Sequence, residues 1–152
     1  MFTSSWTALK ALLVLSVVPS PQSTEVCQDP VFYCRIANSG HSVHLCEHNE
    51  QLTYSFHTGR GAPEKTFSAA RTAAVVTPWN GVDGAYTDAI AIPHGIWSYR
   101  LFTVTPRGAD HPAGAGITSA GITVLRGGQD VRHFTCDAGS VRERVHSLQV
   151  EP

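Results

Sequence analysis

The stretch GIWSYRLFTVT at residues 95–105 decides the fold class, because its pattern is that of one long β-strand. Its apolar side chains alternate between the two faces of an extended chain, with Trp97, Tyr99 and Leu101 on one face and Ile96, Phe102 and Val104 on the other. Apolar residues on both faces predict either a central strand or a β-bulge near Arg100.

Shorter stretches of the same kind lie on both sides of this strand and are separated by turn residues. We expect further strands at residues 32–37, 42–47, 51–57, 86–92, 117–125 and 131–136. About eight short strands at this spacing predict an all-β fold, either a small antiparallel barrel or a sandwich.

Two segments are ambiguous. Residues 64–77 fit a helix by their alanines, or two short strands at 65–68 and 72–77, and we favour the strands. The segment that begins at Ser140 matches a helix capping box, which predicts a short C-terminal helix, with a last strand as the alternative.

The first 23 residues are typical of a signal peptide. Lys10 precedes an apolar run over residues 11–18, which ends at Pro19 and is shorter than the roughly 20 residues that cross a bilayer. The alternative is a helix of the folded domain. We therefore expect cleavage after Ser23, one domain at residues 24–152, a secreted or periplasmic location and no membrane span in the mature form.

Four cysteines, at positions 27, 34, 46 and 136, predict two disulfides in an exported chain. Spacing favours Cys27 with Cys34, which leaves Cys46 to pair with Cys136. That second bridge closes a loop of about 90 residues and contributes roughly 4–5 kcal/mol in the chain-entropy treatment. The main alternative joins Cys34 to Cys46, since a hairpin can place them side by side.

The charge balance argues against nucleic acid as a partner. The formal net charge is −1 and the sequence contains no run of Lys or Arg. Binding to nucleic acid or to an anionic membrane therefore lacks its main electrostatic support. We expect an envelope or extracellular protein as the partner, bound through loops at residues 78–84 and 106–116, with Trp79 and His111 as candidate contacts. For Trp79 itself we favour a side chain folded back onto the core as a lid, with the partner contact as the alternative.

Histidine is frequent, with eight residues in the chain. His44 and His48 fall on one face of a predicted strand, and a third imidazole from His57 would complete a site for Zn or Cu. The preferred interpretation is a polar strand edge with no cofactor. No G-x-S-x-G motif is present, so we assign no catalytic residue and expect no enzyme activity, with a small hydrolase as the weaker alternative.

The order of several segments resembles a group of small exported bacterial proteins of unknown function. The matching segments are Ser42-Val-His-Leu-Cys46, Leu52-Thr-Tyr-Ser-Phe56, Trp97 to Val104 and Phe134-Thr-Cys136, within residues 32–137. The resemblance implies a β fold in the bacterial envelope and no particular activity. Small periplasmic lysozyme inhibitors share the plan of signal, disulfide and compact β-barrel, which makes an inhibitor-like protein the alternative function.

Overall fold

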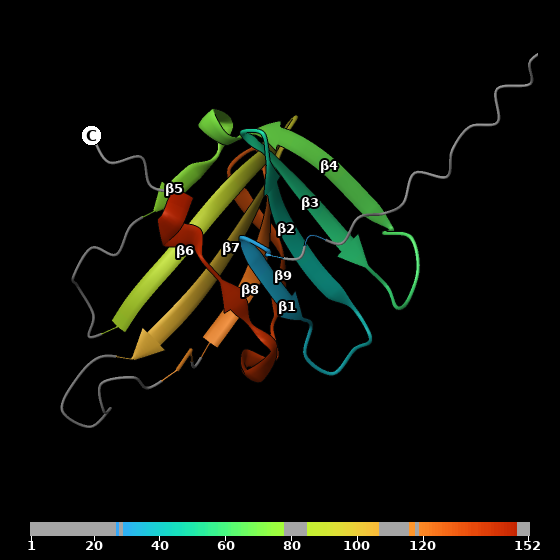
Figure 1. The fold of residues 1–152 in the computed structure, drawn as a ribbon, viewed down its shortest axis with the longest axis vertical. Coiled ribbons are helices and arrows are strands. Elements are labelled where there is room, and N and C mark those ends of the chain that lie inside the picture. The colour runs from blue at the N-terminus through green and yellow to red at the C-terminus, as the bar shows by residue number, and fades with distance from the viewer. Residues whose placement is uncertain (1–26, 28, 78–84, 107–115, 118, 149–152) are drawn as a thin grey trace, which may run out of the picture.

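Two antiparallel sheets of five strands each form the protein (Figure 1). The computed structural model describes residues 27, 29–77, 85–106, 116–117 and 119–148. The expected signal peptide, Trp79 and His111 lie outside these residues. The predicted all-β antiparallel fold is confirmed, with the two sheets arranged as a sandwich.

The strands follow one another almost in sequence order. The first sheet contains, in spatial order, β10 (Arg142–Glu143), β1 (Phe32–Arg35), β2 (Ser42–His48), β3 (Gln51–His57) and β4 (Lys65–Ala70). The second contains β5 (Val75–Thr77), β6 (Ala85–His94), β7 (Trp97–Pro106), β8 (Ser119–Arg126) and β9 (Gln129–Thr135). In Figure 1 the strands of one sheet cross those of the other at a large angle.

The core forms where the alternating apolar faces of the two sheets meet. Leu52 and Tyr54 of β3 point inward, as the sequence pattern predicts. The Tyr54 ring packs against Phe67 of β4 at 5.0 Å and against Tyr99 of β7 at 4.9 Å between ring centres. Aromatic pairs at this spacing add to the hydrophobic contribution of burial. The first sheet is therefore held against the second at Tyr99, near the start of β7.

Strand β7 is central, since it pairs with β6 on one side and β8 on the other. Of the two predicted alternatives, the central position is confirmed and the bulge near Arg100 is wrong. Arg100 pairs in regular register with Ala91 and Thr123, and the irregularity lies instead between β8 and β9, at Val124 and Leu125. A central strand alone accounts for the apolar residues on both faces of this segment.

The ambiguous segments resolve into strands and single turns. Residues 65–77 form β4 and β5, separated by the 3-10 helix η1 (Arg71–Ala73). The C-terminal segment forms β10, preceded by η2 (Ala138–Ser140) and followed by η3 (Val145–Leu148). Ser140 does not cap a helix, because its hydroxyl donates to the carbonyl of Asp137 and accepts from the backbone N–H of Arg35.

The predicted disulfide pairing is wrong, and so is its main alternative. The bonds join Cys27 to Cys46 and Cys34 to Cys136. Cys34 lies on the inner face of β1, fully buried opposite Val43, whereas Cys46 lies on the outer face of β2. Two cysteines on opposite faces of neighbouring strands cannot bond, since their Cβ atoms point apart. Cys27 reaches Cys46 from outside the sheet.

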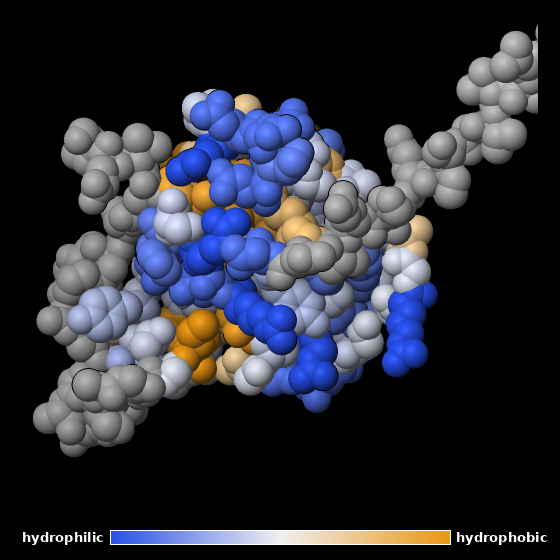
Figure 2. Space-filling model, in the orientation of Figure 1, coloured by the Kyte–Doolittle hydropathy of each residue, from blue (hydrophilic) through white to orange (hydrophobic). Residues whose placement is uncertain are grey.

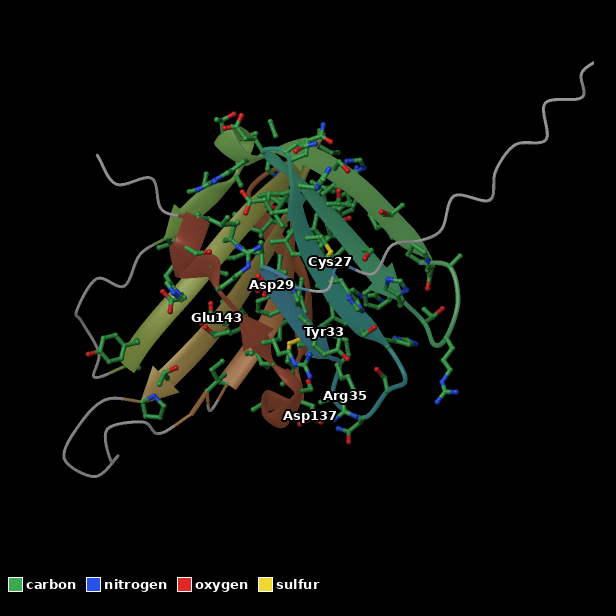
Figure 3. The ribbon with its side chains drawn as sticks, viewed as in Figure 1. Cys27, Asp29, Tyr33, Arg35, Asp137 and Glu143 are labelled. Carbon is green, nitrogen blue, oxygen red and sulfur yellow. A yellow bond between two sulfur atoms is a disulfide. The ribbon has the colours of Figure 1, made fainter. Side chains whose placement is uncertain are left out.

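The side of the molecule that carries β1 is largely hydrophilic (Figure 2). Arg35 and Asp137 form an exposed ion pair of 3.1 Å at one end of β1, and Asp29 lies near the other end (Figure 3). Within the described residues, no helix has the length and apolar character needed to span a membrane.

Candidate functional site

Two of the predicted histidines meet on the outer face of the first sheet. His44 of β2 lies directly across from Ser55 of β3, and His57 of β3 lies across from Ser42 of β2. The two imidazoles are thus diagonal neighbours, with their ring centres 4.8 Å apart. The structure brings this pair together as the alternation of β2 and β3 requires, because all four side chains leave the same face.

Each imidazole has a serine partner on its own strand. His57 Nδ1 lies 3.3 Å from the carbonyl of Gly61, and since a carbonyl only accepts, this nitrogen carries the proton. His57 Nε2 lies 3.2 Å from the hydroxyl of Ser55, from which it accepts when the ring is neutral. His44 Nε2 lies 3.3 Å from the hydroxyl of Ser42. Among the described residues, neither imidazole contacts a carboxylate that would orient it as a general base.

Burial keeps His44 neutral. Desolvation, and secondly the neighbouring His57, lower the pKa of His44 from 6.5 to about 4. The ring of Tyr33 lies edge-on to His44 at 4.8 Å and contributes to this burial. At neutral pH His44 is therefore an uncharged, hydrogen-bonded part of the sheet surface.

His48 does not join this pair. It lies at the far end of β2, opposite Gln51, four residues and about 13 Å along the strand from His44. In the part of the chain that the structure describes, no three side chains of the metal-ligating types converge. Binding of Zn or Cu stays a prediction, as does the role of Trp79 and His111.

A second cluster was not predicted from the sequence. Three basic side chains lie over aromatic rings along the inner face of the second sheet and the neighbouring edge of the first. Lys65 Nζ is 5.4 Å from the Tyr99 ring centre, and the guanidinium carbons of Arg126 and Arg132 are 5.5 and 5.6 Å from the ring centres of Trp97 and Phe134. These distances are those of cation–π contacts.

These pairs form one continuous surface. Phe56 of β3 is the register partner of Lys65 on β4, and its ring lies 5.7 Å from that of Phe134. Across the second sheet, Tyr99 pairs with Val124, and Val124 with Arg132. The contacts therefore form a closed circuit of neighbouring side chains. It runs from Lys65 to Tyr99 and Arg132 on the second sheet, and back through Phe134 and Phe56 to Lys65.

A further cross-strand pair, Trp97 with Arg126, extends this circuit beyond Tyr99 and Val124, toward the β6–β7 and β8–β9 turns. We call the whole set the basic aromatic surface, and it consists of Phe56, Lys65, Trp97, Tyr99, Arg126, Arg132 and Phe134.

The cations of the basic aromatic surface are exposed, and among the described residues none has an acidic partner within ion-pair distance. The nearest acidic residues in sequence, Glu64 and Asp130, form no such pair with them. Phe56, Trp97 and Phe134 are only partly buried. The surface therefore combines accessible ring area with cations that have no ion-pair partner in the part of the chain that the structure describes.

The basic aromatic surface has little signal in the sequence. Its members come from five strands, and its rings match the alternating pattern of an ordinary core. The near-neutral net charge conceals the local excess of cations. The one local hint is the spacing Arg132-x-Phe134, which places a cation and a ring on the same strand face.

Comparison with known proteins gives no further assignment of this surface, because no family model, no curated protein and no solved structure matches the chain.

Proposed function

We propose that the chain is an exported, non-enzymatic protein-binding module whose binding site is the basic aromatic surface. The observation that carries this proposal is the set of three exposed cations over rings with no acidic partner among the described residues. Trp, Tyr and Arg contribute most of the binding energy in protein interfaces, where they cluster in well-packed patches.

The scaffold supports a binding role. Tyr99 lies within the core and Trp97 and Phe134 pack against it, so their rings are held by two sheets and lose little conformational freedom when a partner binds. The sheet edge beside them is formed by β9, and it carries a register shift at its pairing with β8 together with exposed charged residues. Both features oppose the addition of a further strand, so the contact is made by side chains.

Export is the second part of the proposal. Two disulfides are typical of proteins that fold in an oxidising compartment, and none of the four cysteines is free. The signal-like N-terminal segment and the resemblance to exported bacterial proteins favour the bacterial envelope as that compartment. An inhibitor of lysozyme remains the alternative within the same class of binding proteins.

A crosslinking experiment in the native host tests this function. A photoreactive benzoylphenylalanine replaces Val131 on β9, which is 53% exposed beside Arg132. The matched control carries it at Val75 on β5, the opposite edge of the same sheet, which is 62% exposed. We expect a discrete adduct from position 131 that is lost when Arg126 and Arg132 are both replaced by Glu. Equal labelling from both positions, or no adduct from position 131, contradicts the proposal.

A further inference from the structure

We infer that the partner contributes an acidic, extended peptide segment with apolar side chains, and that the basic aromatic surface binds this segment. The inference rests on the proposed function and names the chemistry of its partner. It follows from three properties of the surface: its charge, the spacing of its cations and the accessible faces of its rings.

The positive charge of the surface determines that the ligand is negatively charged. Lys65, Arg126 and Arg132 have no acidic partner among the described residues, although other arginines do: Arg71 contacts Glu47, and Arg144 contacts both Glu47 and Asp29. A cation that lies on a ring is partly shielded from water, which strengthens a charge-assisted hydrogen bond to a carboxylate. The basic aromatic surface therefore favours carboxylates over ammonium groups.

Spacing favours an extended segment. Arg126 is two residues beyond Val124 on β8, and Val124 is the register partner of Arg132. Diagonal neighbours of this kind have Cα atoms roughly 7–8 Å apart. In an extended chain, side chains on one face recur about every 6.6–6.8 Å. Acidic residues at positions i and i+2 of a bound segment can therefore reach both guanidinium groups at once.

The rings account for the apolar part of the ligand. Trp97 and Phe134 are partly exposed, and each ring has a guanidinium group over its face. An apolar side chain of the segment that covers this ring area gains hydrophobic and aromatic contact. Apolar residues at positions i−2 or i+4, which share a face with the acidic pair in an extended segment, are thus expected in the ligand.

A peptide fits better than a polyanion. Three cations in a chain with net charge −1 give a local patch and no long-range positive field. Nucleic acids and anionic membranes bind through many such contacts, so three cations contribute little to their binding energy. Oligonucleotides and anionic vesicles therefore serve as competing ligands in the test.

The test uses two fluorescein-labelled heptapeptides, Phe-Ser-Glu-Ser-Glu-Ser-Phe (the Glu peptide) and Phe-Ser-Lys-Ser-Lys-Ser-Phe (the Lys peptide), with the full oxidised protein in a polarisation assay. In an extended conformation the charged and Phe side chains of each peptide share one face. We expect saturable binding of the Glu peptide, at least tenfold weaker binding of the Lys peptide, and weakening as salt rises. The Arg126→Glu/Arg132→Glu variant loses at least tenfold in affinity for the Glu peptide and gains affinity for the Lys peptide. The control variant Arg100→Glu/Arg142→Glu carries the same change in charge on exposed sites elsewhere and leaves binding unchanged.

Several outcomes overturn the inference: no saturable binding of the Glu peptide, equal binding of both peptides, no effect of the Arg126→Glu/Arg132→Glu change, or tighter binding of phosphatidylglycerol vesicles or oligothymidine. Circular dichroism and the thermal midpoint verify that each variant is folded. If crosslinking from position 131 persists while the peptides bind equally, the binding function holds and the acidic ligand is wrong. If that crosslinking fails, the function itself is wrong.

Discussion

Cys34 and Cys136 form a disulfide that joins the inner face of β1 to the residue following β9, 102 positions later in the chain. Beside this bond, Ile36 pairs with Cys136 in an isolated antiparallel bridge, and Ala37 donates to the carbonyl of Thr135. Strand β1 of the first sheet is fixed at this point to the end of β9, an edge strand of the second sheet. The bond thereby helps to hold Phe56 against Phe134 in the basic aromatic surface.

Removal of this bond is predicted to destabilise the protein more than removal of the other. In the chain-entropy treatment, a closed loop of about 100 residues contributes about 4.7 kcal/mol, and one of 15 to 20 residues contributes about 3 kcal/mol. The double variant Cys34→Ala/Cys136→Ala should therefore lose more free energy of unfolding in urea than Cys27→Ala/Cys46→Ala, whose bond spans 19 positions. A larger loss from the second variant contradicts this prediction.

Glu47 is predicted to hold the C-terminal segment against the sandwich. Its carboxylate contacts Arg71 at 3.0 Å and Arg144 at 3.6 Å, and all three side chains are largely buried. Replacement by Gln leaves two guanidinium groups facing each other, and we expect a cost of about 1–2 kcal/mol, between the values for exposed and buried pairs. Arg35→Gln removes only an exposed ion pair and should cost under about 1 kcal/mol. Equal costs in urea unfolding would refute the assignment.

Gly121 is predicted to tolerate no side chain. A Cβ there would lie 2.6 Å from the backbone oxygen of Phe134 and 2.9 Å from the Phe102 ring, so β8 and β9 would have to separate. Gly121→Ala should cost about 1–3 kcal/mol, as overpacking does. Gly40→Ala, where no atom lies within 4 Å of the added carbon, should change stability by less than about 1 kcal/mol. Thermal unfolding compares the two variants. Similar decreases in their thermal midpoints would show that the close contact at Gly121 does not reduce stability.

The lowered pKa of His44 predicts that the protein loses stability in mild acid. Its pKa is lowered to about 4 in the folded protein, so between pH 6.5 and pH 4 the unfolded chain binds a proton that the folded chain does not. Stability is therefore complete above pH 6.5 and falls as the pH decreases. Because the His44 side chain is only partly buried, the full effect of the shift is reduced, and we expect a loss on the order of 1 kcal/mol between pH 7 and pH 5.

The His44→Gln variant isolates this contribution from the carboxylates that titrate in the same range. Its free energy of unfolding in urea should fall less than that of the wild type between the two pH values. The NMR titration of the His44 ring should in addition show a midpoint well below 6.5, the ordinary pKa of histidine. A His44 midpoint near 6.5 is incompatible with the buried environment described above.

The strands were predictable because their signal is local. In β3, every second residue from Leu52 to Phe56 is apolar, and the predicted bounds at residues 51–57 agree with the structure. The long strand around Tyr99 was found for the same reason, as was its central position. Alternation of this kind reflects burial of one sheet face and needs no knowledge of the fold.

The disulfides and the binding surface were not predictable, because both depend on which strand faces lie opposite each other in space. Sequence spacing favoured Cys27 with Cys34, although the two side chains lie on opposite faces of the first sheet. Likewise, Lys65 and Tyr99 are 34 positions apart and meet only when the two sheets pack. Single-sequence patterns contain neither relationship.

The most direct measurement of the central claim is an NMR titration of the oxidised, isotope-labelled protein with the Glu peptide. The account predicts chemical shift changes at the Trp97 indole, at Arg132 to Phe134 of β9 and at Lys65, with no change at His44 or Ser68 on the opposite face of the first sheet. Changes confined to that opposite face, or none at saturating peptide, would contradict it.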